Sequence, residues 1–415
     1  MVPANQKDAE KKLGNYLENN FMVGHKKLNK PILLAAILLP SLLLHGCTWF
    51  GGKALPADRN TYNIALQRSN DEELLLNLVR LKYRDTPLFL KVGSISSQST
   101  FTSSAKASAT LPVTGTDIFG LGGDASLSIK PTVNYTPLQG KEFNQQYLSR
   151  VKLETILLLI HSGWRIDRIF SVCLQRLGSY GNAVSASSPT PALAPDFEDF
   201  ARAAKLFHFM QFADVFEISL VQVPKEPINP KNQKYTPLLL VDRKSQGKKG
   251  NSKWSKTHED MLKNLLGLEA NEMGFVLGTA KELPQVEHCP KCNKYFQGRK
   301  YLRVETRSLA GIMYFLSQSV QIPVKDQSLV TQTKDEKGRP FYWEKILGNT
   351  LKVHPAKEEP QSAAVKVNYR DSWFYLNDAD QNSKSTFSML TQIFALQAGE
   401  IESHAPVLTL PVGGP

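Results

Sequence analysis

The residues best placed to do chemistry are two cysteines in the second half of the chain, Cys289 and Cys292, with His288 directly before them. Two thiolates at this spacing can bind one metal ion, but a structural zinc site needs four ligands and no second Cys-x-x-Cys pair occurs. In an oxidising compartment the same thiols form a disulfide. A proline between the cysteines also recurs in thiol-exchange motifs, although these place the first cysteine at a helix N-terminus, and the residues here are typical of a turn. We predict a structural disulfide, with a zinc site, a thiol-exchange site or two inert free thiols as the alternatives.

A third cysteine, Cys47, stands where an apolar run gives way to a polar sequence. The basic segment HKKLNK precedes the apolar run 31–44, which is too short to cross a bilayer as a helix. This order of segments is typical of a secretory signal peptide. Leu44-His45-Gly46-Cys47 resembles the lipobox of bacterial lipoproteins, although a small residue is usual in place of His45. The resemblance implies cleavage before Cys47 and attachment of a diacylglycerol and an acyl chain to this residue. The alternative is an uncleaved anchor helix.

The residues around the apolar run indicate where the protein begins and where it is sorted. Residues 1–21 carry no net charge, and Met22 begins a signal sequence of ordinary length, so we predict that translation starts at Met22. By the same resemblance, Thr48 implies sorting to the outer membrane. We expect a lipid-anchored protein that faces the periplasm, because two acyl chains already give stable anchoring. Nucleic acid is not an expected partner at this location.

The basic residues include one dense block. The whole chain carries a net charge of +12, and removal of residues 1–46 takes away six bases and three acids, which leaves +9. A positive surface favours anionic partners such as membrane headgroups. The segment 243–256 has no acid, and its Gly, Ser and Asn residues favour a loop. Its six bases are candidates for contact with anionic headgroups, with a solvated insertion as the alternative: Arg243, Lys244, Lys248, Lys249, Lys253 and Lys256.

No motif predicts catalysis. The segment that begins at Asp378 opens like a calcium-binding loop, but Ser383 replaces the glycine at its sixth position and Met389 replaces the glutamate at its twelfth. We interpret it as a turn in which Asn382 or Ser383 caps the last helix. The sequence contains no Gly-x-Ser-x-Gly, His-Glu-x-x-His or phosphate-binding loop. We therefore assign no catalytic residue and no cofactor beyond the lipid, and we do not predict an enzyme.

The elements that would position these residues begin with a helix and a long hairpin. Helical spacing predicts a helix over 60–84, with a restart at the capping pattern 69–72, its leucines on one face and Arg80, Lys82 and Arg84 largely on the other. Small or apolar residues then alternate with polar ones over 95–109 and again over 125–136, on either side of a Gly-rich turn. This pattern predicts a long amphipathic β-hairpin over 88–136.

Three interpretations of the predicted hairpin remain open. It can pack on the rest of its domain, it can be a disordered Ser/Thr/Ala/Gly segment, or hairpins from several copies can join into a closed channel without free strand edges. The last arrangement is similar in architecture to lipidated export channels of the curli-secretion type.

The rest of the chain predicts an α+β fold. We expect helices over 142–161, 164–177, 197–212, 256–268, 307–319 and 383–397. We expect short strands over 216–223, 238–241, 274–278 and 301–305, and a strand pair that turns at Arg370-Asp371. The predicted organisation is a signal region over 1–46, a lipidated tether over 47–58, a helix–hairpin–helix domain over 59–178, a linker over 179–196 and an α+β domain over 197–415.

Three blocks together resemble an uncharacterised family of bacterial envelope lipoproteins. These blocks are LLLNLVRLKYRDTPLFLKVGSI, VETRSLAGIMYFLSQSVQIP and WFYLNDADQNSKSTFSMLTQIFALQAG. The resemblance implies an envelope location and no particular activity. We expect a non-enzymatic structural or assembly component of an envelope complex, with other envelope proteins as partners. The alternatives are one subunit of a homo-oligomeric export channel built from the hairpin, and a thiol or zinc protein centred on Cys289 and Cys292.

Overall fold

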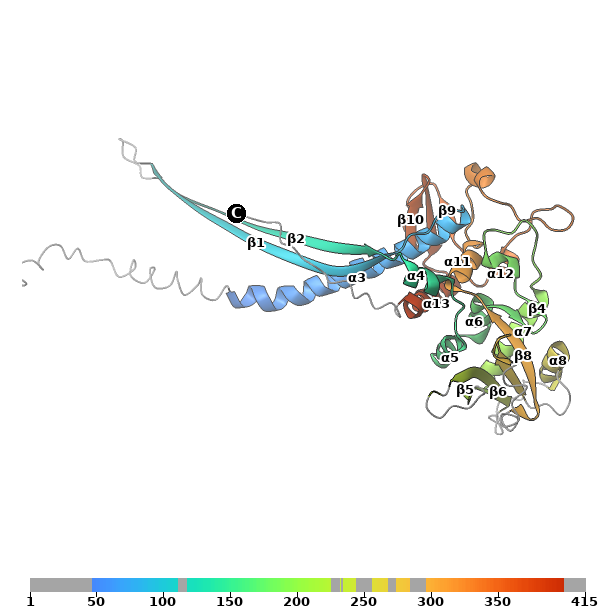
Figure 1. The fold of residues 1–415 in the computed structure, drawn as a ribbon. Helices are drawn as coiled ribbons and strands as arrows, with labels where there is room; N and C mark the ends of the chain where they lie inside the picture. The colour runs from blue at the N-terminus through green and yellow to red at the C-terminus, as the bar shows by residue number, and fades with distance from the viewer. Residues whose placement is uncertain are drawn as a thin grey trace, which may run out of the picture. The chain divides into compact units, whose positions relative to one another are not determined.

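A computed structural model describes residues 47–110, 118–224, 232, 234–243, 256–267, 274–283 and 296–398. The chain divides into two compact units, Met1–Ser69 and Asn70–Pro415. Helices and strands both contribute large shares of the fold, which is therefore mixed α+β, as the sequence predicts (Figure 1).

The first described element is the helix α3, Cys47–Lys82. It includes the residues for which we expected a lipidated tether, and it runs without interruption through the predicted restart at 69–72. Leu75 and Leu78 are fully buried, as their spacing predicts. Lys82 is also buried, which corrects the expectation that it faces away from the leucines.

The end of α3 is closed by hydrogen bonds in the backbone. Arg84 adopts a left-handed conformation, with a φ of 65°. The Asp85 amide donates to the Arg80 carbonyl over 2.9 Å and the Arg84 amide donates to the Leu81 carbonyl over 3.1 Å. This pair of bonds is the Schellman arrangement, which satisfies the last carbonyl groups of a helix and turns the chain sharply.

Two long strands follow, β1 (Leu90–Thr110) and β2 (Ile118–Pro137), and they pair antiparallel as a two-stranded sheet. The register runs from Leu90 opposite Pro137 to Thr110 opposite Ile118, with one bulge between Val92 and Ser94. Beyond the bulge, each odd-numbered residue of β1 pairs with an odd-numbered residue of β2. Among the residues described, neither strand pairs with a third.

The largest sheet has six strands in the order β4-β3-β8-β7-β6-β5. Its pairs are antiparallel except for β7 with β8, which run parallel. The strands are β3 (Leu174–Leu177), β4 (Tyr180–Gly181), β5 (Phe216–Pro224), β6 (Tyr235–Arg243), β7 (Gly274–Gly278) and β8 (Arg299–Thr306). The predicted linker 179–196 therefore lies inside one compact unit, because β3 before it pairs with β8 after it.

The helices around this sheet agree with most of the predicted ranges and correct two. They are α4 (Lys141–Leu148), α5 (Leu153–His161), α6 (Ile166–Cys173), α7 (Glu198–Phe212), α8 (Lys256–Leu266) and α11 (Leu309–Ser317). The single helix predicted over 142–161 is wrong, because Arg150 bridges Ser308 and the Val151 amide donates to the Arg307 carbonyl over 2.9 Å. The helix predicted over 164–177 ends at Cys173, where the chain enters β3.

The C-terminal part of the unit contains a small sheet and a long helix. Strands β9 (His354–Ala356), β10 (Ala363–Tyr369) and β11 (Ser372–Asn377) pair in the order β10-β11-β9, and the predicted turn at Arg370-Asp371 is confirmed. Both turn residues have positive φ, 51° and 56°. Such a turn matches the twist of the two strands it connects. Two short helices, η2 (Val324–Leu329) and α12 (Glu344–Leu347), precede this sheet, and α13 (Gln381–Ala398) follows it.

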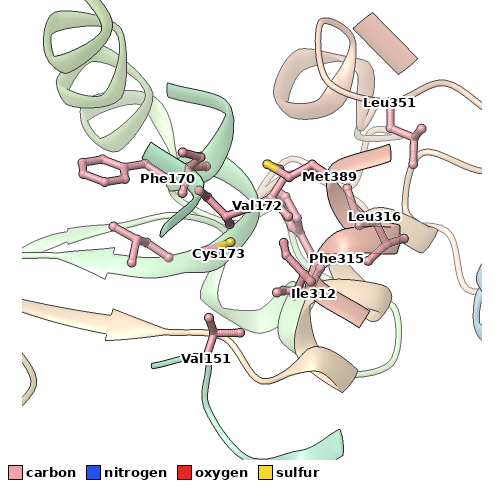
Figure 2. Packing of buried hydrophobic residues seen from close by; sticks show 14 of the residues in the cluster. Val151, Phe170, Val172, Cys173, Ile312, Phe315, Leu316, Leu351 and Met389 are labelled. Carbon is pink, nitrogen blue, oxygen red and sulfur yellow. The ribbon is translucent and has the colours of Figure 1, made fainter. Parts of the chain in front are cut away.

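One hydrophobic core joins most elements of this unit. Figure 2 shows its centre, where side chains from α6, α11 and α13 meet. Phe170, Ile312, Phe315 and Met389 are at most 1% exposed. Close packing of this kind makes the interior sensitive to changes of a single methyl group. The core explains why the residues on both sides of the predicted linker fold together.

Substitution of Gly274, the first residue of β7, provides a test of the packing in the six-stranded sheet. A methyl group at this position would overlap the backbone carbonyl of Val241 on β6. Because a backbone group cannot rotate away, we expect Gly274→Ala to lower the free energy of unfolding by about 1–3 kcal/mol. Urea denaturation measures the change. Gly181→Ala is the control, since the nearest atom to its added methyl group is Cγ2 of Val184 at 3.5 Å, an ordinary van der Waals contact, and its φ is not positive. An equal loss in both variants would contradict the steric argument.

Candidate functional site

The residues that the sequence analysis singled out fall mostly outside the described part of the chain. Cys289 and Cys292 lie there, and so do Lys244, Lys248, Lys249 and Lys253. Arg243 is the last residue of β6 and Lys256 is the first residue of α8. Cys47 is the first residue of α3. The predictions for these side chains therefore remain predictions.

The base of the β1–β2 hairpin is held by polar side chains of α3. Asn77 is fully buried and brackets Leu88, because its amide group donates to the Leu88 carbonyl over 2.7 Å and its side-chain oxygen accepts from the Leu88 amide over 3.0 Å. The Glu73 carboxylate accepts from the Leu90 amide over 3.1 Å. Burial raises the pKa of Glu73, although this hydrogen bond acts in the opposite direction. These contacts fix the first residues of β1 to the helix.

Aromatic rings complete the attachment of the hairpin. Phe89 is 3% exposed, and its ring lies within 5.7 Å of the rings of Phe143 and Tyr147 on α4 and within 5.0 Å of Phe394 on α13. The Leu138 amide donates to the Phe89 carbonyl over 2.8 Å and closes the hairpin at its base. Aromatic clusters of this geometry add to the stabilisation that burial alone provides. Both ends of the hairpin therefore connect directly to the core.

A buried arginine, Arg307, joins the sheet to the end of α6. Its guanidinium donates to the carbonyl oxygens of Ser171, Val172 and Leu174 over 3.0, 3.1 and 2.6 Å. It also donates to the Asn182 carbonyl and to the Ser187 hydroxyl. The Phe315 ring covers its face at 3.9 Å. Burial lowers the pKa of Arg307 to about 9, so it remains protonated at neutral pH.

The position of Arg307 suits a structural role. The last carbonyl groups of a helix have no partner within the helix, and they carry the negative end of its dipole. A planar group with five donors can satisfy several of them at once. Cys173 lies beside it in the same interior, where burial raises the pKa of its thiol to about 12.

The Cys173 thiol gives a test of this interior. Because the thiolate is the reactive form, a fully buried thiol with a pKa of about 12 is expected to resist alkylation in the folded protein. We expect maleimide to label Cys173 only after denaturation, as measured by mass spectrometry of the peptide that contains it. Labelling of Cys173 in the native protein at the rate of a free cysteine would contradict this interior position.

A second buried base, Lys82, ends α3. Its ammonium group donates to the Gln318 side-chain oxygen over 2.9 Å, and burial lowers its pKa to about 8. The neighbouring Tyr83 donates to the buried carboxylate of Asp326 over 2.7 Å, and burial followed by this bond raises the pKa of Tyr83. Both contacts connect the end of α3 to segments 236 and 243 residues away in sequence.

A polar network surrounds the turn between β10 and β11. Tyr369 donates to the Asp85 carboxylate over 2.5 Å, and Arg370 donates to the same oxygen over 2.9 Å. The Arg370 guanidinium lies over the Tyr83 ring at 4.9 Å. Burial alone would raise the pKa of Asp85, but the bonds from Tyr369 and Arg370 hold it below its usual value. These contacts stabilise the turn, because they offset the conformational free energy that the positive φ of Arg370 costs.

The segment with a calcium-like opening is a turn, as interpreted from the sequence. The residue that caps α13 is Asp380, which corrects the expectation for Asn382 or Ser383. Its carboxylate accepts from the amides of both of those residues over 3.1 Å and from the Ser383 hydroxyl over 2.6 Å. Asp378 forms an ion pair with Lys384 at 2.6 Å. These carboxylates are thus occupied by partners within the chain.

A cleft of about 550 Å³ lies between α6, α7 and α12, next to the start of α13. Cations line it from several elements, namely Arg165, Arg168, Lys205 and Lys345. Asp167 and Glu344 are the two carboxylates in its lining. Its volume is within the range of small-molecule sites. Sequence analysis did not find these residues, because they come from four separate segments.

The described residues contain no group of three or more His, Cys, Asp or Glu side chains that could hold a metal ion. None of the helices described is both long and apolar enough to cross a membrane. Comparisons of the chain with models of protein families, with curated proteins and with solved structures find no match.

Proposed function

We propose that this chain is an outer-membrane lipoprotein that serves as a non-enzymatic structural or assembly component of a bacterial envelope complex. In this proposal the anchor is Cys47 with its diacylglycerol and acyl chain, and the β1–β2 hairpin is the assembly element. The anchor rests on the sequence that ends at Cys47, and the role of the hairpin rests on its geometry.

The observation that carries the proposal is the two-stranded sheet of 21 and 20 residues. An isolated hairpin is at best marginally stable in water, and exposed strand edges invite pairing with other chains. Beyond the bulge, odd-numbered residues pair with one another, so the small or apolar set of one strand is aligned with that of the other. This register supports the predicted amphipathic hairpin. Its firm attachment at Asn77 and Phe89 suits an element that transmits contacts to the core.

The anchor is tested by the variant Cys47→Ser. We expect the wild-type protein to remain in the membrane fraction of Gram-negative cells and to incorporate labelled palmitate, and the variant to do neither. Intact mass of the wild-type protein locates the cleavage before Cys47. An unmodified wild-type protein, or one that keeps residues 1–46, would contradict the lipoprotein proposal.

The assembly role is tested by shortening the hairpin in register. Replacing 99–129 with Asn-Gly leaves Gln98 opposite Lys130 and supplies a two-residue turn that suits the hairpin. The base of the hairpin and the core are unchanged by this design. Light scattering of the detergent-extracted protein should show a complex for the wild type and a smaller species for the shortened variant. A wild-type protein that remains monomeric and pulls down no envelope protein would contradict an assembly role.

The second candidate is a subunit of an oligomeric outer-membrane export channel. The same observation favours it, because hairpins from several copies can join edge to edge without leaving free strands. The two functions differ in one measurement. Conductance across planar bilayers that is lost on shortening the hairpin supports the channel, whereas a stable complex without conductance supports the structural role.

The third candidate is the thiol or zinc site at Cys289 and Cys292. Thiol titration and metal analysis of the Cys173→Ala variant test it separately, since this variant removes the buried thiol from the count. If the protein contains no bound zinc and no reducible bond, this candidate is excluded.

A further inference from the structure

The cleft between α6, α7 and α12 carries an excess of positive charge. Arg165 is paired with Asp167, through bonds of 3.1 and 2.7 Å. The other carboxylate of the lining, Glu344, accepts from Gln321 over 2.8 Å. In the described part of the chain, Arg168, Lys205 and Lys345 form no ion pair within 4 Å, and the carboxylates of Asp167 and Asp380 act on Arg168 from a longer distance. Three cations therefore remain without an ion pair around the cavity, against one carboxylate, Glu344, whose partner Gln321 carries no charge. With four cations and two carboxylates, the lining has a formal net charge of 4 − 2 = +2.

Arg168 is the fixed point among these three cations. It is half-buried on the first turn of α6, and its guanidinium donates to the Asn382 side-chain oxygen over 2.8 Å at the start of α13. That bond orients the guanidinium and leaves further donors available, because arginine carries five. Lys205 on α7 is exposed, as is Lys345, whose ammonium group lies 5.7 Å from the Phe341 ring. Lysine side chains on flexible stems can move toward a bound charge.

The remaining walls of the cleft are apolar or neutral. Ala201, Ala204 and Phe209 of α7 face it, together with Ile346 of α12. Phe209 is 49% exposed, which is unusual for a large apolar residue next to a positively charged lining. Hydroxyl and amide groups of Ser171, Asn349 and Thr350 add donors and acceptors. Ligand sites typically combine apolar walls with a few polar groups of this kind.

The charge of the cleft selects among anions. A carboxylate brings a single negative charge, whereas a phosphate monoester brings about −1.5 to −2 at neutral pH and three acceptor oxygens. A lining with a formal net charge of +2, which includes an arginine, matches the second group better. The helix dipole of α6 acts in the same direction, since its first turn lies at the cleft.

We propose that this cleft binds a small organic phosphate monoester, with the phosphate on Arg168, Lys205 and Lys345 and the organic part against Phe209 and Ile346. The phosphate belongs either to a soluble sugar phosphate or to the headgroup of a phosphorylated lipid, and the chemistry of recognition is the same for both. The inference goes beyond the proposed function and does not depend on the anchor or on the hairpin.

The test uses the full mature protein in mild detergent. Isothermal titration with glucose 6-phosphate measures binding of a soluble monoester, and glucose is the probe without phosphate. Sedimentation with phosphatidylcholine vesicles that contain phosphatidic acid measures binding of a lipid headgroup. The variant Lys205→Glu/Lys345→Glu reverses the two lysines of the cleft. Arg202→Glu is the control, because it reverses an exposed cation of the same helix, one that pairs with Asp199 and does not line the cleft.

We expect saturable binding of at least one phosphate probe, weakened about tenfold or more in the double variant and within about twofold of wild type in the control. Binding of glucose 6-phosphate assigns a soluble ligand. Binding of the vesicles alone, with the same loss in the double variant, assigns a lipid headgroup. The proposal is overturned if neither probe binds, if glucose binds as tightly as its phosphate, or if Arg202→Glu weakens binding as much as the double variant does.

Discussion

Replacement of the buried arginine, Arg307→Met, is expected to lower the free energy of unfolding by about 3–5 kcal/mol. The side chain satisfies carbonyl oxygens at the end of α6 and the carbonyl of Asn182. Methionine fills a similar volume but has no donor, so several buried carbonyl groups lose a partner at a cost of about 1–3 kcal/mol each. Proteins are stable by about 5–15 kcal/mol, so the loss is a large share of the total.

Urea denaturation of the purified protein measures this change. Arg303→Met on the same strand is the control, because Arg303 is exposed and its ion pair with Glu305 lies near the surface. Surface ion pairs of this kind contribute about 0–1 kcal/mol. Arg307→Lys should recover only part of the loss, since an ammonium group cannot donate to the same set of oxygens. A loss below about 1 kcal/mol in Arg307→Met would contradict the structural role assigned to it.

The second large effect is a dependence of stability on pH through Lys82. The folded protein holds its pKa at about 8, against 10.5 for the unperturbed side chain. The unfolded chain therefore binds a proton more tightly at this residue than the folded protein does. Below pH 8 both states are protonated, and the folded protein bears the full cost of the buried charge. Between pH 8 and about 10.5 only the unfolded chain keeps the proton, so the free energy of unfolding rises with pH until that cost is gone. The gain is about 3 kcal/mol at most.

Comparison with the variant Lys82→Met isolates this contribution. The difference in unfolding free energy between the two proteins should favour the variant below pH 8 and shrink as the pH approaches 10, because groups common to both proteins cancel. Above pH 10 both proteins should lose stability, since burial raises the pKa of Tyr83 and Tyr147 while tyrosines of the unfolded chain ionise. Lys141→Met, at an exposed position of α4, is the control. A constant difference from pH 6 to pH 10 would contradict the lowered pKa.

Local patterns predicted much of the fold of the described residues. The strands β10 and β11 and their turn at Arg370-Asp371 could be predicted from the sequence, because strand periodicity and turn position depend on neighbouring residues. The helix α7 could be predicted for the same reason. The break between α4 and α5 was not, because it depends on a bridge between Arg150 and Ser308, which are far apart in sequence. The strand β3 continues an apolar helical pattern, and its pairing with β4 and with the distant β8 accounts for its extended conformation.

The same distinction applies to the polar sites. Arg168, Lys205 and Lys345 line the cleft from three separate segments. The spacing of these residues in the sequence does not indicate that the segments lie close together. Lys82 fits a polar helical face by its type, yet tertiary packing buries it against Gln318. The helix predicted over 307–319 begins at Arg307, and no local pattern indicates that this side chain is buried. In contrast, the cap of α13 was nearly found, because caps depend on local hydrogen bonds, and the expected residues lie two and three positions after Asp380.

The pairing of β3 with β8 has a consequence for how this chain folds. The contacts of Arg307 with the end of α6 join residues that are 133 to 136 positions apart, and they close a loop of that length. Contacts so distant form late, because the entropy of loop closure must be overcome before any of them is gained. Until then the central strands of the six-stranded sheet present unpaired edges. Closure of this loop is therefore expected to limit the folding rate of the unit, and aggregation during refolding should be greatest in the interval before it.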